Sequence, residues 1–470
     1  MQPVIVKENL LPRTIVLCFD GTGNKFGENS NVVRLFRALV KDKPDEQIVY
    51  YQPGVGTYNQ RQFFTQTVSG LASALDKGVA LHLNDHVKEG YQFIMRNYRR
   101  GDKICLFGFS RGAHTARVVA GMLYKVGLLP AHNDQQLDFA FSVYQTTGSH
   151  GVELSKEFKK TFAIPVTVEF VGVWDTVSSV GIIPRSHPYT SVNYAVKTFR
   201  HALALDERRA RFRPQTWNEP TVEREQDLDV DDPHLIMIKK PSDKSRDEWE
   251  YQPPDRTTTD VKEVWFTGAH ADVGGGSHKN DVQESLSYIP LRWMIKECLL
   301  AGTGVLFDQR ALSLIDYFGS PSLSLSSFPS FFSALQPANI GFVSIPSNAI
   351  LEIQNLFGHN HPLLNLAIKH AKDATDCVAK VWDQLQMQRA WWALEVLPML
   401  TTYQRPDGVW VRKRVRNFGQ GRYIPFSKNK VLVHISVQER INASTPEKPY
   451  RPAAFNWETV VGSGMLEYVS

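Results

Sequence analysis

The stretch KICLFGFSRGAHTARVVAGML, residues 103–123, decides the fold. An apolar run at 104–107 is followed by Gly108-Phe109-Ser110-Arg111-Gly112, and apolar residues then recur at helical spacing. A serine at so tight a turn takes strained backbone angles, and glycines two residues to either side remove the collisions that side chains would cause there. The pattern predicts a turn that lifts the Ser110 hydroxyl out of the carboxyl edge of a sheet.

This order of strand, serine and helix is the nucleophile elbow of α/β-hydrolase folds. Further apolar runs at 14–19, 47–52, 166–174 and 262–267 indicate strands, and helical spacing recurs at 79–98, 114–126 and 289–300. Strands that alternate with helices favour a mostly parallel sheet covered on both faces. We therefore expect an α/β-hydrolase-like fold with a helical or irregular insertion and a C-terminal extension.

Changes in composition predict three regions along the 470 residues. A catalytic core is expected over 1–305, with a polar, proline-containing surface insertion at 213–260. A helical, lid-like subdomain is expected over 306–400; it includes the Ser-, Phe- and Pro-rich segment 307–360 and a long helix over 363–397. Residues 401–470, with strand-like runs at 408–415 and 430–437, form an extension that packs on the core.

Charge and cysteine content exclude several classes of protein. The net charge of +5 is spread without a long basic block, so nucleic acid is not an expected partner. The four cysteines have no CxxC spacing, which favours free thiols and a cytoplasmic location. We see no signal peptide and no apolar run of about 18 residues, so we expect no transmembrane helix. Peripheral membrane contact and the oligomeric state stay open, and we expect no cofactor or metal.

A serine nucleophile needs a base, and the base needs an orienting acid. In this fold the chain order is serine, acid, histidine, with each residue just after a strand. Asp175 follows the run 166–174, and His270 follows the run 262–267. We therefore predict that Ser110, Asp175 and His270 form a catalytic triad.

Three other residues are alternatives for these roles. Asp272 is a second candidate for the acid, but it lies only two residues from His270, and support of the Gly274–Gly276 turn fits it better. His434 ends a strand-like run and is the alternative base. His114 lies on the helix after Ser110 and is expected to pack or to line the pocket.

The oxyanion hole is expected to combine two backbone donors. One is the N–H of Arg111, at the start of the helix, and the other is the N–H of Gly21 or Thr22. The loop that begins at Asp20 lacks the spacing of a phosphate-binding P-loop. Asp20 and Asp272 are an alternative cation site through their oxygens, although nothing in their spacing requires one.

Five ordered motifs resemble a known family over residues 12–300: FDGTGN, GFSRGAHTAR, VGVWDTV, RHALALDERR and WFTGAHADVGGG. The family is an α/β-hydrolase family long filed as a domain of unknown function, and its best-known members are bacterial type VI secretion phospholipase effectors. AWWALEVLP, RPDGVWVRKRV, GRYIP and HISVQER in the tail are similar to fungal members. The resemblance implies a Ser–Asp–His triad and an esterase or phospholipase reaction. Within RHALALDERR, Arg200 and Asp206 are expected to form a structural ion-pair network.

These observations predict a serine hydrolase that cleaves hydrophobic or lipid-like carboxylic esters through an acyl-serine intermediate. Segment 307–360 and the pair Trp391-Trp392 are interpreted as a lid or acyl-binding wall, with ordinary core as the alternative. Two other functions stay open: acyl transfer by the same triad, and non-catalytic binding on a hydrolase scaffold.

Overall fold

The computed structural model describes residues 12–21, 27–54, 68–177, 187–217, 250–251, 259–282, 284–314, 373–405, 407, 409–425, 430–447 and 449–470. Within these residues, eight parallel strands form one sheet in the order β11-β10-β7-β5-β4-β3-β1-β2. Their bounds are β1 Thr14–Phe19, β2 Gln47–Gln52, β3 Lys103–Phe109, β4 Val168–Trp174, β5 Val196–Ala204, β7 Asp260–Phe266, β10 Val431–His434 and β11 Leu466–Val469. The predicted fold class, an α/β-hydrolase-like parallel sheet, is confirmed.

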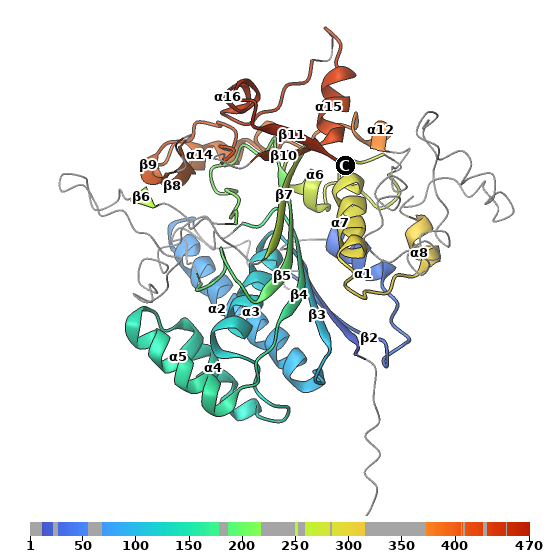
Figure 1. Cartoon of the computed structure of the whole chain (residues 1–470). Coiled ribbons are helices and arrows are strands. Elements are labelled where there is room, and N and C mark those ends of the chain that lie inside the picture. The colour runs from blue at the N-terminus through green and yellow to red at the C-terminus, as the bar shows by residue number, and fades with distance from the viewer. Residues whose placement is uncertain are drawn as a thin grey trace, which may run out of the picture.

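Helices cover both faces of this sheet (Figure 1). One face carries α2 (Val68–Asn97), α3 (Arg111–Val126), α4 (Leu137–Gln145) and α5 (Gly148–Phe162), with the short η1 (Asp134–Gln136) before α4. The other face carries α1 (Asn31–Ala38), α7 (Tyr288–Leu300) and α8 (Gln309–Leu314). None of the helices in the described ranges is both long enough and apolar enough to cross a membrane.

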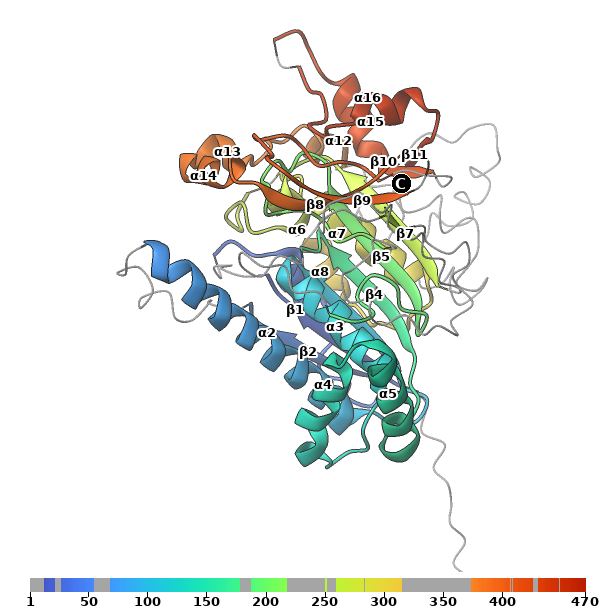
Figure 2. The ribbon, with the colours of Figure 1, turned by 90° about the vertical axis from the view of Figure 1, so that its left-hand side faces the viewer.

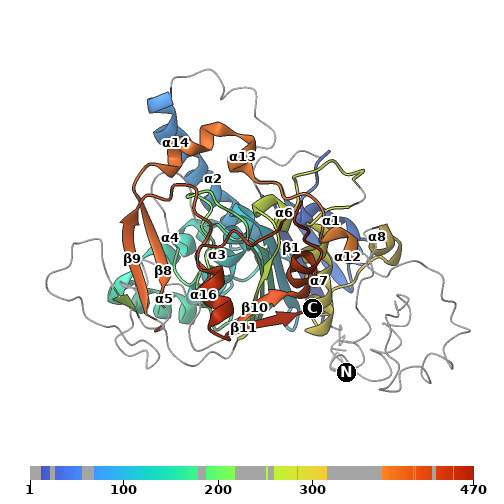
Figure 3. The ribbon, with the colours of Figure 1, turned by 90° about the horizontal axis from the view of Figure 1, so that it is seen from above.

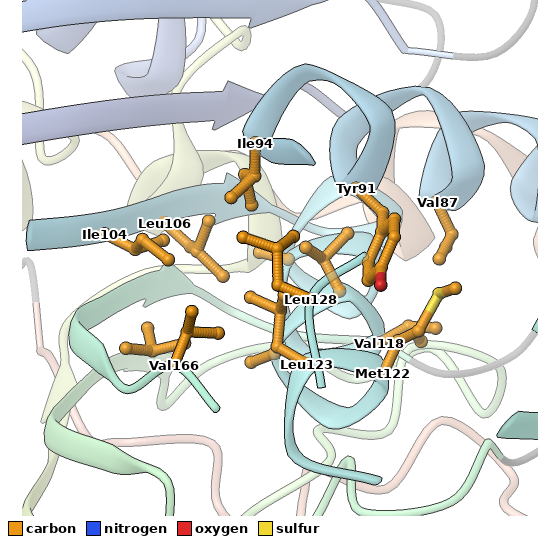
Figure 4. Close-up of a cluster of buried hydrophobic side chains, with 14 of the residues drawn as sticks. Val87, Tyr91, Ile94, Ile104, Leu106, Val118, Met122, Leu123, Leu128 and Val166 are labelled. Atoms are coloured by element: carbon orange, nitrogen blue, oxygen red, sulfur yellow. The ribbon is translucent and has the colours of Figure 1, made fainter. Parts of the chain in front are cut away.

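Strand β1 shows that the sheet is buried on both of its faces. All six of its residues are buried. Ile15 and Leu17 pack into the cluster under α2 and α3, whereas Val16 and Cys18 pack into the cluster under α1 and α7. Figure 4 shows the first cluster, where Tyr91 of α2 lies among side chains of β3 and α3. Because alternate residues of a strand point to opposite faces, a strand that is apolar throughout is buried on both.

The strand order reverses between β1 and β3. The chain passes from β1 to β2 on one side and then returns to β3 on the other side of β1. Loops that leave neighbouring parallel strands in opposite directions open a crevice at the carboxyl edge, which is where ligands bind in such sheets. The turns that begin at Asp20 and Ser110 follow these two strands and therefore lie together at that edge.

The C-terminal part of the chain extends the sheet and adds a second one. Strands β10 and β11 are its last two members, and α15 (Ile435–Asn442) and α16 (Trp457–Gly462) pack beside them. A separate antiparallel sheet contains β6 (Glu250–Tyr251), β9 (Trp410–Val415) and β8 (Met399–Gln404). Figure 3, a view from above, shows β8 and β9 apart from β10 and β11.

Four sequence predictions need correction. Strand β5 was not predicted, because Lys197, Arg200 and His201 interrupt its apolar residues. Arg200 is buried and pairs with Glu297 at 2.5 Å and Asp260 at 2.6 Å, so its expected partner Asp206 is wrong. The helix expected over 79–98 begins at Val68.

The long helix expected over 363–397 is also wrong in its described part. From residue 373 onward the chain forms short pieces separated by turns. They are α12 (Asp373–Asp376), α13 (Gln384–Met387), the 3-10 helix η4 (Arg389–Trp391) and α14 (Trp392–Glu395). Most of the predicted insertion 213–260 and of the segment 307–360 lies outside the described residues. The four cysteines are free, as predicted, and all four are buried.

Candidate active site

Ser110 lies in the strained turn that the sequence predicts. Its backbone has φ 58° and ψ −120°, and its N–H donates to the carbonyl of Trp174 at 3.0 Å. A Cβ at Gly108 would lie 2.5 Å from the carbonyl oxygen of Gly112, and one at Gly112 would collide with the Phe19 carbonyl. Both glycines are therefore required, because the turn presses the start of α3 against β1 and β3.

Ser110, His270 and Asp175 form one chain of hydrogen bonds. The Ser110 Oγ lies 2.8 Å from His270 Nε2, and His270 Nδ1 lies 2.5 Å from Asp175 Oδ2. His270 opens α6 (His270–Gly274) just after β7, and Asp175 follows β4 with φ 43°. All three side chains are buried, although they are 95 and 160 residues from their partners in the sequence.

Arg422 holds the carboxylate of Asp175 from the far side. Its Nη1 donates to Oδ1 at 2.5 Å and its Nη2 to Oδ2 at 2.8 Å, while the N–H of Ala204 also donates to Oδ1 at 2.9 Å. The guanidinium is fixed in turn by the carbonyl oxygens of Phe212 and Ala204. A two-pronged pair of this kind restrains a carboxylate in rotation as well as in position.

Burial alone would raise the pKa of the Asp175 carboxyl. Arg422 and His270 outweigh this effect and hold that pKa well below its usual range. Asp175 is therefore ionised, and its carboxylate can accept a hydrogen bond from the Nδ1–H group of a neutral His270. The second nitrogen, Nε2, is then left to accept a proton from Ser110.

Burial is the main cause that holds the His270 imidazole neutral. Burial lowers its pKa, and nearby Arg209 lowers it further, whereas Asp175 and Glu207 oppose the shift. Glu207 accepts the backbone N–H of His270 at 3.2 Å and pairs with Arg209 at 2.8 Å. A neutral imidazole at neutral pH is the form that a general base requires.

Aromatic rings lie against this histidine. The rings of Phe109 and Phe212 are 4.7 and 4.9 Å from that of His270, and the guanidinium of Arg209 lies 3.4 Å from the Phe212 ring. The ring of Trp391 lies 5.6 Å from Phe212. The wall of the site beside the imidazole is therefore aromatic.

One of the expected oxyanion donors is engaged elsewhere. The N–H of Gly21 donates to Asp20 Oδ1 at 2.7 Å, so Gly21 does not offer a free donor. Asp20 also accepts the hydroxyls of Ser30 and Tyr51, at 2.6 and 2.9 Å, and thereby shapes the turn after β1. Thr22 lies outside the described residues. The Arg111 N–H starts α3 and makes no hydrogen bond within the described part of the chain.

The alternative candidates have other contacts. Asp272 accepts the N–H groups of Ala269 and Trp382, both through Oδ2, and stabilises the start of α6. His434 stacks on Phe266 and accepts the Ser436 N–H, so it is not the base beside Ser110. His114 is buried, with its two ring nitrogens on Gln215 and His187. In the described ranges no three His, Cys, Asp or Glu side chains group as metal ligands would.

Sequence reasoning missed Arg422, Glu207 and Arg209. Arg422 lies in the GRYIP motif, and the other two lie in RHALALDERR. Both motifs stand out in the sequence. Neither has a helical or strand-like spacing that would predict which carboxylate its arginine contacts. The sequence around all three residues is polar or charged, so no local signal singles them out.

A family model described as "T6SS, Phospholipase effector Tle1-like, catalytic domain" matches residues 13–297. The chain belongs to this family. The match includes Ser110, Asp175 and His270 but ends before Arg422. The candidate site thus combines the family domain with a residue from the C-terminal part of the chain.

Three other proteins are similar to this chain, one in sequence and two, more distantly, in structure. The uncharacterized protein YEL023C of Saccharomyces cerevisiae is 28% identical over 560 residues, which cover 94% of this chain and 80% of that protein. A crystal structure of an uncharacterized Pseudomonas aeruginosa protein has a TM-score of 0.35 and 16% identity, over 96% of this chain and 66% of that one. The Tle1 effector bound to the VgrG spike of the type VI secretion system has a TM-score of 0.30 and 20% identity, over 59% and 53%.

Proposed function

We propose that this protein is a serine hydrolase that cleaves carboxylic esters of hydrophobic or lipid-like substrates through an acyl-serine intermediate. The observation that carries the proposal is the hydrogen-bonded chain from Ser110 Oγ through His270 to Asp175. Membership of a family whose model is named for phospholipase effectors supports an ester of lipid type.

The geometry suits acyl transfer to Ser110. His270 Nε2 takes the serine proton as Oγ attacks the ester carbonyl, and Asp175 holds the imidazole in the required tautomer. The free N–H of Arg111 stabilises the oxyanion, with a second donor from the turn after β1. His270 then protonates the leaving alcohol and activates water for deacylation. A single oxyanion donor typically contributes about 10²–10³ in turnover.

The acyl chain is expected to lie against the aromatic wall beside His270. Phe212 and Trp391 form this wall in the structure, and a hydrocarbon chain gains by leaving water for such a surface. Residues 315–360, most of the segment predicted as a lid, lie outside the described residues, and a lid there is part of the proposal.

A fluorophosphonate probe tests the nucleophile directly. We expect a covalent adduct on Ser110 of the full chain, and none on the Ser110→Ala variant. Hydrolysis of p-nitrophenyl esters is expected to rise with acyl length and to extend to phospholipids. An unlabelled Ser110 in a folded protein would leave only a binding role. Products formed in the presence of added alcohol separate hydrolysis from acyl transfer.

We also propose a cytoplasmic location, because four free and buried thiols suit a reducing compartment. Fractionation of cells that express the tagged chain tests this. Recovery in an oxidising compartment would contradict the proposal.

A further inference from the structure

Five apolar side chains are exposed together near the candidate site. Met387, Trp392, Val396, Leu397 and Phe418 expose between 41% and 59% of their surface. They are five of the eleven large apolar side chains that are exposed in the described residues. We call these five residues the apolar face. Monomeric soluble proteins rarely expose such side chains as a group unless the group contacts something.

The apolar face is held together by contacts between two distant segments. The N–H of Phe418 donates to the carbonyl of Glu395 at 3.0 Å, which ties the 417–419 turn to α14. Trp392 Nε1 donates to the carbonyl of Leu385 at 3.1 Å, which ties α14 to α13. Figure 2 shows α13 and α14 at the margin of the molecule, above α2. The five side chains therefore project from a built surface.

This surface adjoins the candidate site. Trp391 lies between the two, next to Trp392 in the chain and 5.6 Å from the ring of Phe212. The Phe212 ring in turn lies 4.9 Å from His270. A hydrophobic molecule that leaves the apolar face thus meets the ring of Trp391 and then that of Phe212, with the guanidinium of Arg209 stacked against both rings and paired with Glu207.

The surroundings of the apolar face are basic. Residues 384–420 contain six Lys or Arg and two acidic residues. Of the acidic pair, Glu395 is buried and accepts backbone and amide hydrogens, and Asp407 pairs with Arg405. Arg389 and Arg416 are exposed, and the ion pairs that the described residues form nearby, Arg208 with Asp383 and Arg405 with Asp407, involve neither of them. The surface is therefore complementary to one that is both apolar and anionic.

We propose that the apolar face docks on the surface of a phospholipid bilayer that contains anionic lipids. Trp and aliphatic side chains insert at the boundary of headgroups and acyl chains, while Arg389 and Arg416 contact phosphates. The proposal rests on the proposed function, since it gives lipid esters a path to Ser110. It does not require a membrane-spanning helix.

Vesicle sedimentation of the full chain tests this docking. The Ser110→Ala variant is used so that the lipid is not consumed, with vesicles of phosphatidylcholine alone or mixed with phosphatidylserine. We expect stronger binding to the mixed vesicles, and an added Val396→Ser/Leu397→Ser pair to weaken it about tenfold or more. Arg389→Gln/Arg416→Gln is expected to remove the preference for phosphatidylserine and its dependence on salt.

A matched control is available on the other side of the molecule. Phe139 and Phe162 of α4 and α5 are 50% and 39% exposed, and Phe139→Ser/Phe162→Ser is expected to leave vesicle binding unchanged. Equal losses in both pairs of variants would overturn the proposal. So would self-association of the chain through the apolar face in the absence of lipid.

The two proposals fail in different ways. With Ser110 intact, Val396→Ser/Leu397→Ser is expected to keep hydrolysis of a soluble short-chain ester while losing that of vesicles. If no vesicle binds but the soluble ester is cleaved, the docking surface is refuted and the hydrolase stands. If vesicles bind but Ser110 reacts with neither ester nor fluorophosphonate, the hydrolase is refuted and the docking surface stands.

Discussion

The guanidinium of Arg422 contacts both carboxylate oxygens of Asp175, at 2.5 Å from Oδ1 and 2.8 Å from Oδ2. Asp175 has no exposed surface, so an ionised carboxylate there needs a counter-charge. Arg422 supplies it without occupying the oxygen lone pair that faces His270 Nδ1. The candidate acid is thus kept ionised and oriented by one side chain.

Replacement of Arg422 by Gln should change both stability and pH dependence. Loss of one partner of a buried ion pair costs about 3–5 kcal/mol of unfolding free energy. Without the nearby cation, the Asp175–His270 pair is expected to take up its proton at higher pH. The acid limb of kcat/KM for a soluble ester therefore moves toward alkaline pH, while Arg422→Lys moves it less.

Arg13 provides the control for this variant. It pairs with Asp102 at 2.9 Å, and both side chains are buried at the amino ends of β1 and β3, opposite the site. Arg13→Gln is expected to cost similar stability in urea unfolding but to leave the pH profile unchanged. An equal shift in both variants would mean that Arg422 acts only through stability.

The strain at Ser110 should be measurable as stability. Its φ of 58° costs about 1–3 kcal/mol for a residue with a side chain, and only glycine avoids that cost. Glycine loses about 0.5–1 kcal/mol through the flexibility of the unfolded chain. We expect Ser110→Gly to be inactive and about 1–2 kcal/mol more stable than Ser110→Ala. Equal melting curves for the two variants would show that the turn is relaxed.

The glycines of the elbow should not tolerate a methyl group. Gly112→Ala would place a Cβ against the carbonyl oxygen of Phe19, and the backbone there cannot move away easily. We expect this variant to lose about 3 kcal/mol or more of unfolding free energy. Gly462, at the end of α16, has open space around its Cα. Gly462→Ala is expected to be neutral or to stabilise by up to about 1 kcal/mol. Urea unfolding of the two variants checks the contrast.

Buried His434 should contribute to acid instability. Burial, followed by Lys296 and Arg292, lowers the pKa of its imidazole to about 3. Between about pH 6.5 and that value the unfolded chain binds a proton that the folded chain does not, so stability falls as pH falls. His434→Asn keeps an acceptor for the Ser436 N–H and should reduce this slope by about 1.4 kcal/mol per pH unit.

The difference in unfolding free energy between wild type and His434→Asn isolates this histidine from others. Burial raises the pKa of Asp272 to about 7, so this residue makes stability rise as pH falls over the same range. Its contribution is the same in both proteins and therefore cancels in the difference. An unchanged slope in the variant would mean that His434 is protonated or exposed in the folded state.

The sequence predicts a structural feature well where the interactions that cause the feature lie within one short stretch of chain. The strands β1 and β3 are apolar throughout, and the glycines around Ser110 act on atoms within the same turn. The sequence is a poor guide to β5, because Arg200 is made tolerable by Glu297, which is 97 residues away. Arg422 was missed for the same reason, since no local pattern relates it to a carboxylate 247 residues earlier. The Gly21 donor was misjudged because the neighbouring Asp20 side chain takes its hydrogen.

The distance along the chain between Asp175 and Arg422 also orders events during translation. During synthesis, Ser110 and then Asp175 leave the ribosome well before Arg422, the counter-charge of Asp175, is added to the chain. In the interval the carboxylate has no counter-charge and cannot settle into the interior, so the histidine lacks a fixed neighbour. Under the proposed function, a growing or prematurely terminated polypeptide is therefore expected to cleave no ester until Arg422 has been added.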